Sequence, residues 1–67
     1  MENSQFFHGG AFDIPAFCKA HNISRALLYK LLREGRGPTL MKCGRRTLIS
    51  TETAADWRRN LEAKSAA

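Results

Sequence analysis

"NISRALLYKLLREGRGP", residues 22–38, contains a helix-forming run between a start signal and a stop signal. Ser24 precedes the run, and its hydroxyl can accept a hydrogen bond from the unpaired backbone N–H groups of a first helical turn. Gly35 and Pro38 follow it, and both residues favour the end of a helix. The stretch therefore predicts a helix over residues 25–34.

This predicted helix has two faces, because successive side chains on a helix are about 100° apart. One face is apolar and is expected to pack on the preceding helix; it carries Leu27, Leu28, Leu31 and Leu32. The opposite face is expected to look outward; it carries Ala26, Tyr29, Lys30 and Arg33, with Arg25 at its flank. The outward face combines cations with one tyrosine, which is typical of a binding surface.

The segment before it predicts another helix. Its apolar residues follow the i, i+3, i+4, i+7 spacing of one helix face: Ile14, Phe17, Cys18 and His21. Asp13 can cap its start, and Pro15 lies in the first turn, where a missing N–H costs nothing. Asn22 suits the left-handed residue that follows a helix, with Ile23 packing behind it. Only a tight turn fits between the two helices.

The stretch "TLMKCGRRTLIS", residues 39–50, predicts a β-hairpin. Two short apolar runs flank Gly44-Arg45, and glycine at the first central position suits a type II′ turn. Pairing across this turn puts an apolar and a polar pair on opposite faces: Met41 with Leu48, and Lys42 with Thr47. The tip then projects Arg45 and Arg46. A two-stranded hairpin is marginal alone, so it must pack on the helices.

A third helix is predicted after the hairpin, with Ser50 or Thr51 as its cap. Its apolar stripe consists of Ala54, Trp57 and Leu61, and we expect Trp57 in the core. Arg58 and Glu62 are spaced to form an i, i+4 ion pair.

The 67 residues are enough for one small domain. Residues 1–12 have no hydrophobic period and are expected to form a flexible lead-in, from which some phenylalanines pack on the domain. The domain is expected over residues 13–62, followed by a frayed end at 63–67. The predicted fold is mostly α-helical with one small β-hairpin.

Positive charge is concentrated in one third of the chain. Residues 25–46 contain one anion, Glu34, and seven cations: Arg25, Lys30, Arg33, Arg36, Lys42, Arg45 and Arg46. The formal net charge is +5, so this block carries the whole excess. Solvated surfaces usually mix both signs, and the block therefore indicates a binding site for a polyanion.

Duplex DNA fits this arrangement, because its major groove admits an α-helix with phosphates on either side. Ser24 and Arg25 would enter the groove first, Arg25 with a guanine, and Tyr29 would meet a phosphate or a thymine methyl. The remaining cations would hold phosphates or reach the minor groove. The candidate DNA-binding residues are Ser24, Arg25, Ala26, Tyr29, Lys30 and Arg33 in the helix, and Lys42, Gly44, Arg45 and Arg46 in the hairpin.

Simpler interpretations exist for several of these residues. Cations on a helix face often serve only solvation, and Tyr29 could cover the rim of the core. His21 is expected to be a satisfied core or capping residue. An alternative function is a protein-interaction module whose cationic face binds an acidic partner. Salt-sensitive duplex binding would separate DNA from a protein partner.

Other classes of function find less support. Ser, His and Asp occur, but nothing places them together, so no enzyme, cofactor or catalytic residue is predicted. A zinc site would need Cys18, Cys43, His8 and His21, whose spacing matches no usual pattern, and both thiols are expected to be buried and reduced. The sequence has no apolar run of membrane-spanning length and no signal peptide, which favours a cytoplasmic location without membrane contact.

Three segments, "FCKAHNISRALLYKLLREGRGP", "MKCGRRTLIS" and "AADW", resemble the small excisionase/AlpA-like proteins of phages and bacterial mobile elements. These belong to the MerR-like winged helix-turn-helix group. The resemblance covers residues 12–61, and three motifs carry it: Ser24-Arg25-x-x-x-Tyr29, Gly44-Arg45-Arg46 and Trp57.

The resemblance implies a winged helix-turn-helix that binds specific DNA sites in a bacterial or phage-infected cell. The role would be excision, with a tyrosine-type integrase as partner, or transcriptional regulation. The dimerisation helix and effector domain of full MerR regulators are missing, so no small-molecule effector is expected. We expect a monomer in solution that self-associates on directly repeated DNA sites and bends them.

Overall fold

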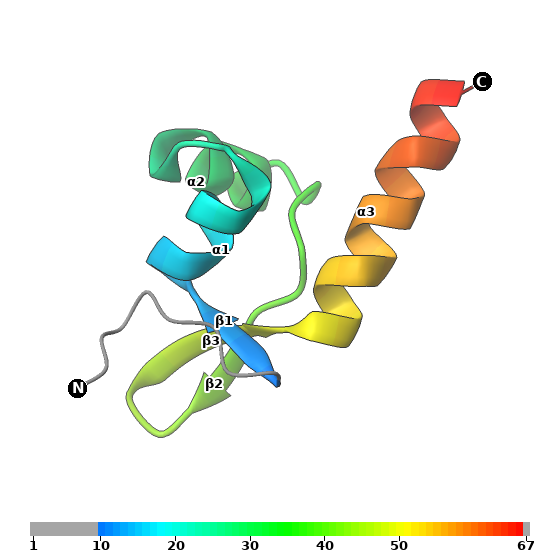
Figure 1. Cartoon of the computed structure of the whole chain (residues 1–67). Helices are drawn as coiled ribbons and strands as arrows, with labels where there is room; N and C mark the ends of the chain where they lie inside the picture. Colours follow the sequence, from blue (N-terminus) through cyan, green and yellow to red (C-terminus); the bar gives the residue numbers. More distant parts are fainter. Residues whose placement is uncertain (1–9, 67) are drawn as a thin grey trace.

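The computed structural model describes residues 10–66. This part of the chain forms a small mixed α/β domain with three helices and a three-stranded antiparallel sheet. The elements follow in the order β1 (Ala11–Asp13), α1 (Ile14–His21), α2 (Arg25–Arg33), β2 (Met41–Cys43), β3 (Arg46–Ser50) and α3 (Thr51–Ala66). Figure 1 shows α1 and α2 on one side of the sheet, whereas α3 leaves the end of β3 and extends away from both.

The predicted caps of the first two helices are confirmed. The Ala16 N–H donates to Asp13 Oδ1 at 2.9 Å, and the Leu27 N–H donates to Ser24 Oγ at 3.0 Å. Asn22 has the expected left-handed conformation, with φ 58° and ψ 44°. The Ile23 N–H then donates to the Cys18 carbonyl at 3.0 Å, which closes α1 with a Schellman motif. The turn between α1 and α2 is therefore fixed by local hydrogen bonds.

The hairpin register also agrees with the prediction. Met41 lies opposite Leu48, and Lys42 lies opposite Thr47. Gly44 has φ 62°, while Arg45 is not among the described residues with positive φ, and a positive φ at the first central position alone is the mark of a type II′ turn. Gly44 therefore fixes the length and direction of the hairpin.

The sheet differs from the prediction by one strand. β1 pairs with β3 in antiparallel fashion, so β3 is central in the order β1-β3-β2. Two residues of β1 belong to the segment that was predicted to be a flexible lead-in, 1–12. A strand of three residues is too short to show a period of two, and pairing with β3 is what stabilises it. Residues 1–9 of the predicted lead-in lie outside the described part.

The core lies between α1, α2, the first turns of α3 and one face of the sheet. Phe17, Leu28 and Ile49 are its largest fully buried side chains. Phe12 on β1 lies opposite Ile49 and is buried with it, which confirms that a phenylalanine near the N-terminus packs on the domain. The edge of the Phe12 ring meets Phe17, with centroids 5.8 Å apart. β1 therefore supplies a core residue as well as hydrogen bonds.

The predicted leucine face of α2 is only partly buried. Leu28 is fully buried and Leu32 packs partly against the core, whereas Leu31 is half-buried and Leu27 is 40 % exposed. The expectation that all four leucines would pack inward was wrong for Leu27. A helix of nine residues meets the core along its Leu28–Leu32 row, and Leu27 lies beside that row near the start of the helix.

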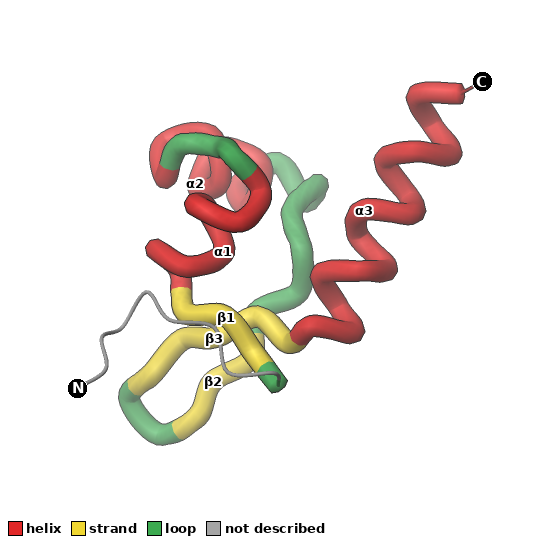
Figure 2. Tube along the Cα trace, in the orientation of Figure 1, coloured by secondary structure: helices red, strands yellow, loops and turns green. Residues whose placement is uncertain are grey.

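Helix α3 is longer than predicted, because it continues to Ala66 through most of the expected frayed end, 63–67. Ala54 is fully buried and Trp57 packs partly against the core, but Leu61 is 42 % exposed. Figure 2 shows that the last turns of α3 extend beyond the other elements. The apolar stripe is therefore used only in its first half.

The predicted Arg58–Glu62 ion pair does not form. Arg58 instead donates to Nε2 of His21 at 2.9 Å, and Arg59 pairs with Asp56. His21 lies within reach because the end of α1 faces α3. A spacing rule within one helix cannot anticipate such a partner.

Candidate nucleic-acid interface

The outward face of α2 is present as predicted. Ala26, Tyr29, Lys30 and Arg33 are all exposed, and Arg25 is exposed at the start of the helix. Tyr29 is 45 % exposed and is not among the partly buried side chains that pack against the core. The Ser24 oxygen is occupied as an acceptor by the Leu27 N–H, which leaves its hydroxyl hydrogen for another acceptor.

The cations of this face have no anionic partner among residues 10–66. None of the described Asp or Glu side chains forms an ion pair with Arg25, Lys30 or Arg33. The nearby Glu34 carboxylate instead pairs with Arg36 at 2.8 Å. The outward face of α2 therefore presents uncompensated positive charge, which attracts an anion more strongly than a surface with mixed charge.

The three hairpin cations differ in their surroundings. Lys42 donates to Thr47 Oγ1 at 3.0 Å across the strand pair. Arg46 lies 3.7 Å from Asp13 Oδ2, whose other oxygen caps α1. Arg45, at the turn, is exposed and has no ion-pair partner among residues 10–66. Arg45 is therefore the hairpin cation whose charge is least compensated.

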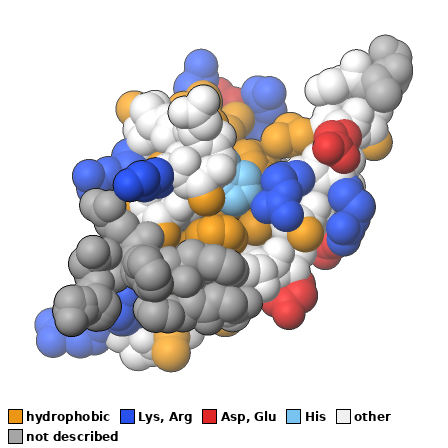
Figure 3. Space-filling model, viewed as in Figure 1, with side chains coloured by type: hydrophobic (Ala, Val, Ile, Leu, Met, Phe, Trp, Pro, Cys, Tyr) orange, Lys and Arg blue, Asp and Glu red, His pale blue; other side chains and the backbone are white. Residues whose placement is uncertain are grey.

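Figure 3 shows how the cations are spread over one face of the molecule. Lys and Arg side chains lie at the α2 end and at the hairpin end of the left-hand side of this view, and a further group lies along α3. The cations of α2 and those of the hairpin are separated in sequence by the loop 34–40. In this view, Lys and Arg side chains therefore lie both over the helices and over the hairpin.

Trp57 supports that loop from α3. Its Nε1–H donates to the Arg36 carbonyl at 2.9 Å, and its ring centroid lies 5.5 Å from that of Phe17. Gly35, with φ 73°, closes α2, and its N–H donates to the Leu32 carbonyl. Sequence reasoning placed Trp57 in the core but missed its hydrogen bond, since nothing in the spacing links positions 36 and 57.

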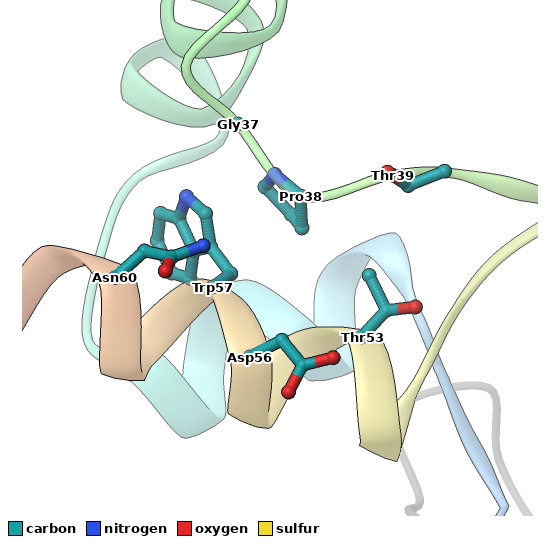
Figure 4. Close-up of a pocket in the computed structure, with 7 residues that line it drawn as sticks. All are labelled: Gly37, Pro38, Thr39, Thr53, Asp56, Trp57 and Asn60. Carbon is teal, nitrogen blue, oxygen red and sulfur yellow. The ribbon is translucent and has the colours of Figure 1, made fainter.

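The loop and α3 enclose a small polar hollow of about 200 Å³. Figure 4 shows the seven residues that line it: Gly37, Pro38, Thr39, Thr53, Asp56, Trp57 and Asn60. Within the described residues, no three His, Cys, Asp or Glu side chains gather as metal ligands. None of the candidate DNA-binding residues of α2 or of the hairpin lines this hollow.

Both ring nitrogens of His21 form hydrogen bonds. Arg58 can only donate, so Nε2 is the acceptor, and Nδ1 then carries the hydrogen and donates to the Phe17 carbonyl at 2.9 Å. The imidazole also stacks on Phe17, with centroids 4.1 Å apart. This agrees with the expected satisfied residue at the end of α1, and it connects α1 to α3.

The two cysteines have different environments. Cys18 is buried in the core, and burial raises the pKa of its thiol, although the charge of Arg25 acts in the opposite direction. Cys43 is exposed at the end of β2, which contradicts the expectation that both thiols are buried. The hairpin extends beyond the helices that would cover it, and its alternation alone could not reveal this.

No helix among the described residues is long and apolar enough to cross a membrane. In comparisons with known proteins, no family model, no curated protein and no solved structure matches this chain.

Proposed function

We propose that the chain is a sequence-specific double-stranded DNA-binding protein with a winged helix-turn-helix arrangement. Helix α2 would be the recognition helix, and the β2–β3 hairpin would be the wing. One observation carries the proposal: the whole outward face of α2 is exposed, and its three cations have no anionic partner among the described residues. The arginine at the hairpin turn adds a second cationic element.

The residues would divide their work by position. Arg25, at the start of α2, is placed to bind the edge of a guanine, and the Ser24 hydroxyl can donate beside it. Lys30 and Arg33 lie further along the helix and would bind phosphates. Arg45 would neutralise a phosphate next to the groove that α2 occupies.

Salt-dependent binding tests this proposal. Fluorescence anisotropy of a labelled duplex should show affinity that falls linearly on a plot of log K against log salt, with a slope of about −0.9 for each phosphate contact. Three to four phosphate contacts give a slope of about −2.7 to −3.6. Absence of duplex binding at low salt would instead favour the alternative function, a module that binds an acidic protein partner.

Within this proposal, the protein acts as an excisionase of a phage or mobile element, together with a tyrosine-type integrase in the cytoplasm. It would load on repeated sites and bend the DNA. An AlpA-like transcriptional regulator would use the same surface. Excision by a purified integrase, measured with and without the protein, separates these roles: no stimulation of excision from a DNA that the protein binds would favour the regulator.

A further inference from the structure

Trp57 lines a second surface as well as the polar hollow. This second surface is a groove of about 310 Å³ between α3 and the α1–α2 turn. His21 and Ile23 form one wall, and Trp57, Arg58, Leu61 and Glu62 form the other. No hydrogen bond or ion pair connects α3 beyond Arg58 to the rest of the described chain. The groove ends beside the part of α3 in which Leu61 is 42 % exposed.

Three neighbouring side chains of α3 border this groove in a definite order. Arg58, Leu61 and Glu62 are spaced i, i+3 and i+4, so they lie on one face of the helix. Arg58 is directed to His21, and the Glu62 carboxylate has no partner among residues 10–66. An exposed leucine thus lies between a cation and an uncompensated anion.

We infer that this face of α3 binds the same face of a second copy of the chain, with the two helices antiparallel and a two-fold axis near Leu61. In that arrangement, Arg58 of each copy lies opposite Glu62 of the other, at levels about 3 Å apart along the helix axes. The two leucines meet over the grooves. A parallel pair would instead bring arginine next to arginine and glutamate next to glutamate, so the charges select the antiparallel pair.

The contact is weak by construction. It offers one exposed leucine and one intermolecular ion pair per copy. The area that such a contact buries is smaller than the roughly 1,200–2,000 Å² buried in stable complexes. Two copies held on neighbouring DNA sites have effective concentrations in the mM range, and there the contact forms. This consequence rests on the proposed function. Because the contact is two-fold, it joins inverted half-sites rather than the directly repeated ones expected from the sequence.

Cross-linking without DNA tests the contact itself. In a Cys43→Ser background, Leu61→Cys should give a disulfide-linked dimer when the folded protein is oxidised with diamide. Arg59→Cys is the matched control, because position 59 is exposed on the other side of the same helical turn. At least fivefold more dimer from position 61 is expected; equal yields at the two positions would overturn the antiparallel contact.

Charge reversal tests the ion pairs on DNA. On a duplex with two inverted half-sites, Glu62→Lys and Arg58→Glu should each abolish a cooperativity of about tenfold, whereas Glu52→Lys, outside the groove, should keep it. An equimolar mixture of the Glu62→Lys and Arg58→Glu proteins should restore cooperativity, because the introduced lysine then faces the introduced glutamate. If the mixture stays non-cooperative, the proposed pairing of Arg58 with Glu62 of the second copy is wrong. If the unaltered protein does not bind the duplex at all, the proposed DNA-binding function is contradicted instead.

Discussion

Arg25 combines a fixed backbone position with an uncompensated charge. Ser24 caps the helix through its hydrogen bond to the Leu27 N–H, so the chain direction at position 25 is set by local geometry. No described carboxylate competes for the guanidinium. A preformed, unpaired arginine at a helix start is suited to selective binding because little has to be rearranged when it meets its ligand.

Replacement of Arg25 by alanine should reduce specificity as well as affinity. Loss of a bidentate contact to guanine should cost about 1–3 kcal/mol on the target site and less on random DNA. Lys30→Ala on the same face is the control, since loss of a phosphate contact should weaken both duplexes alike. Competition titrations measure both effects, and an equal loss on the two duplexes for Arg25→Ala would exclude base reading.

Gly37 is a packing position. A Cβ at Gly37 would lie 2.8 Å from Leu32 Cδ2 and 3.2 Å from Leu32 Cγ, and Leu32 packs partly against the core. Gly37→Ala should therefore lower the free energy of unfolding by about 1–3 kcal/mol through overpacking. Gly10→Ala, where no atom lies within 4 Å of the new Cβ, should have a much smaller effect. Urea denaturation measures both variants; equal stabilities would show that Leu32 moves aside without strain.

At the scale of elements, the hairpin depends on β1. A two-stranded ribbon is marginal alone, and β3 gains a second antiparallel neighbour through β1. The ion pair between Arg46 and Asp13 connects the same two strands. Arg46 thus contributes to the sheet through Asp13, whereas Arg45 at the turn remains available for a ligand.

The two hairpin arginines should therefore differ in their effect on DNA binding. Arg45→Ala should reduce the slope of log K against log salt by about one unit, whereas Arg46→Ala should reduce it by less. The double variant should lose one to two units. Arg59→Ala is the control, because Arg59 lies on α3 and pairs with Asp56. An unchanged slope in the double variant would remove the hairpin from the interface.

At the scale of the whole molecule, small size limits what one copy can do. A single DNA-binding module covers about 600–1,000 Å² of its own surface, at the low end for specific complexes. On the proposed function, contacts between neighbouring copies would add to this affinity. The groove beside Leu61 offers a surface for the proposed contact between two copies. Most of the α3 face near it is polar, so we expect two copies in free solution to remain separate.

We expect a monomer in solution and curved DNA in the multi-copy complex. Sedimentation should give a single species of monomer mass, and circular permutation should show a larger bend with two sites than with one. Gel shifts on probes with one half-site and with two inverted half-sites measure the cooperativity. Tight binding to a single isolated site on straight DNA would contradict the architectural role and leave a simple regulator.

The sequence by itself determined those features that depend on neighbouring residues. The caps at Asp13 and Ser24, the left-handed Asn22 and the hairpin register around Gly44 all follow from hydrogen bonds within a few positions. The outward face of α2 follows equally, because helix geometry fixes which side chains share a face. These interactions have short range, so a local pattern is sufficient to predict them.

Only the tertiary structure decided which faces are covered and which distant groups meet. It added β1, left Leu27 and Cys43 exposed, and paired Arg58 with His21 instead of Glu62. Each of these depends on a remote element. β1 is too short to show a period of two and is stabilised by its pairing with β3. The hairpin extends beyond the helices that would bury Cys43, and the end of α1 offers His21 to Arg58. Burial and long-range pairing are properties of the packed chain, and a local pattern carries no information about them.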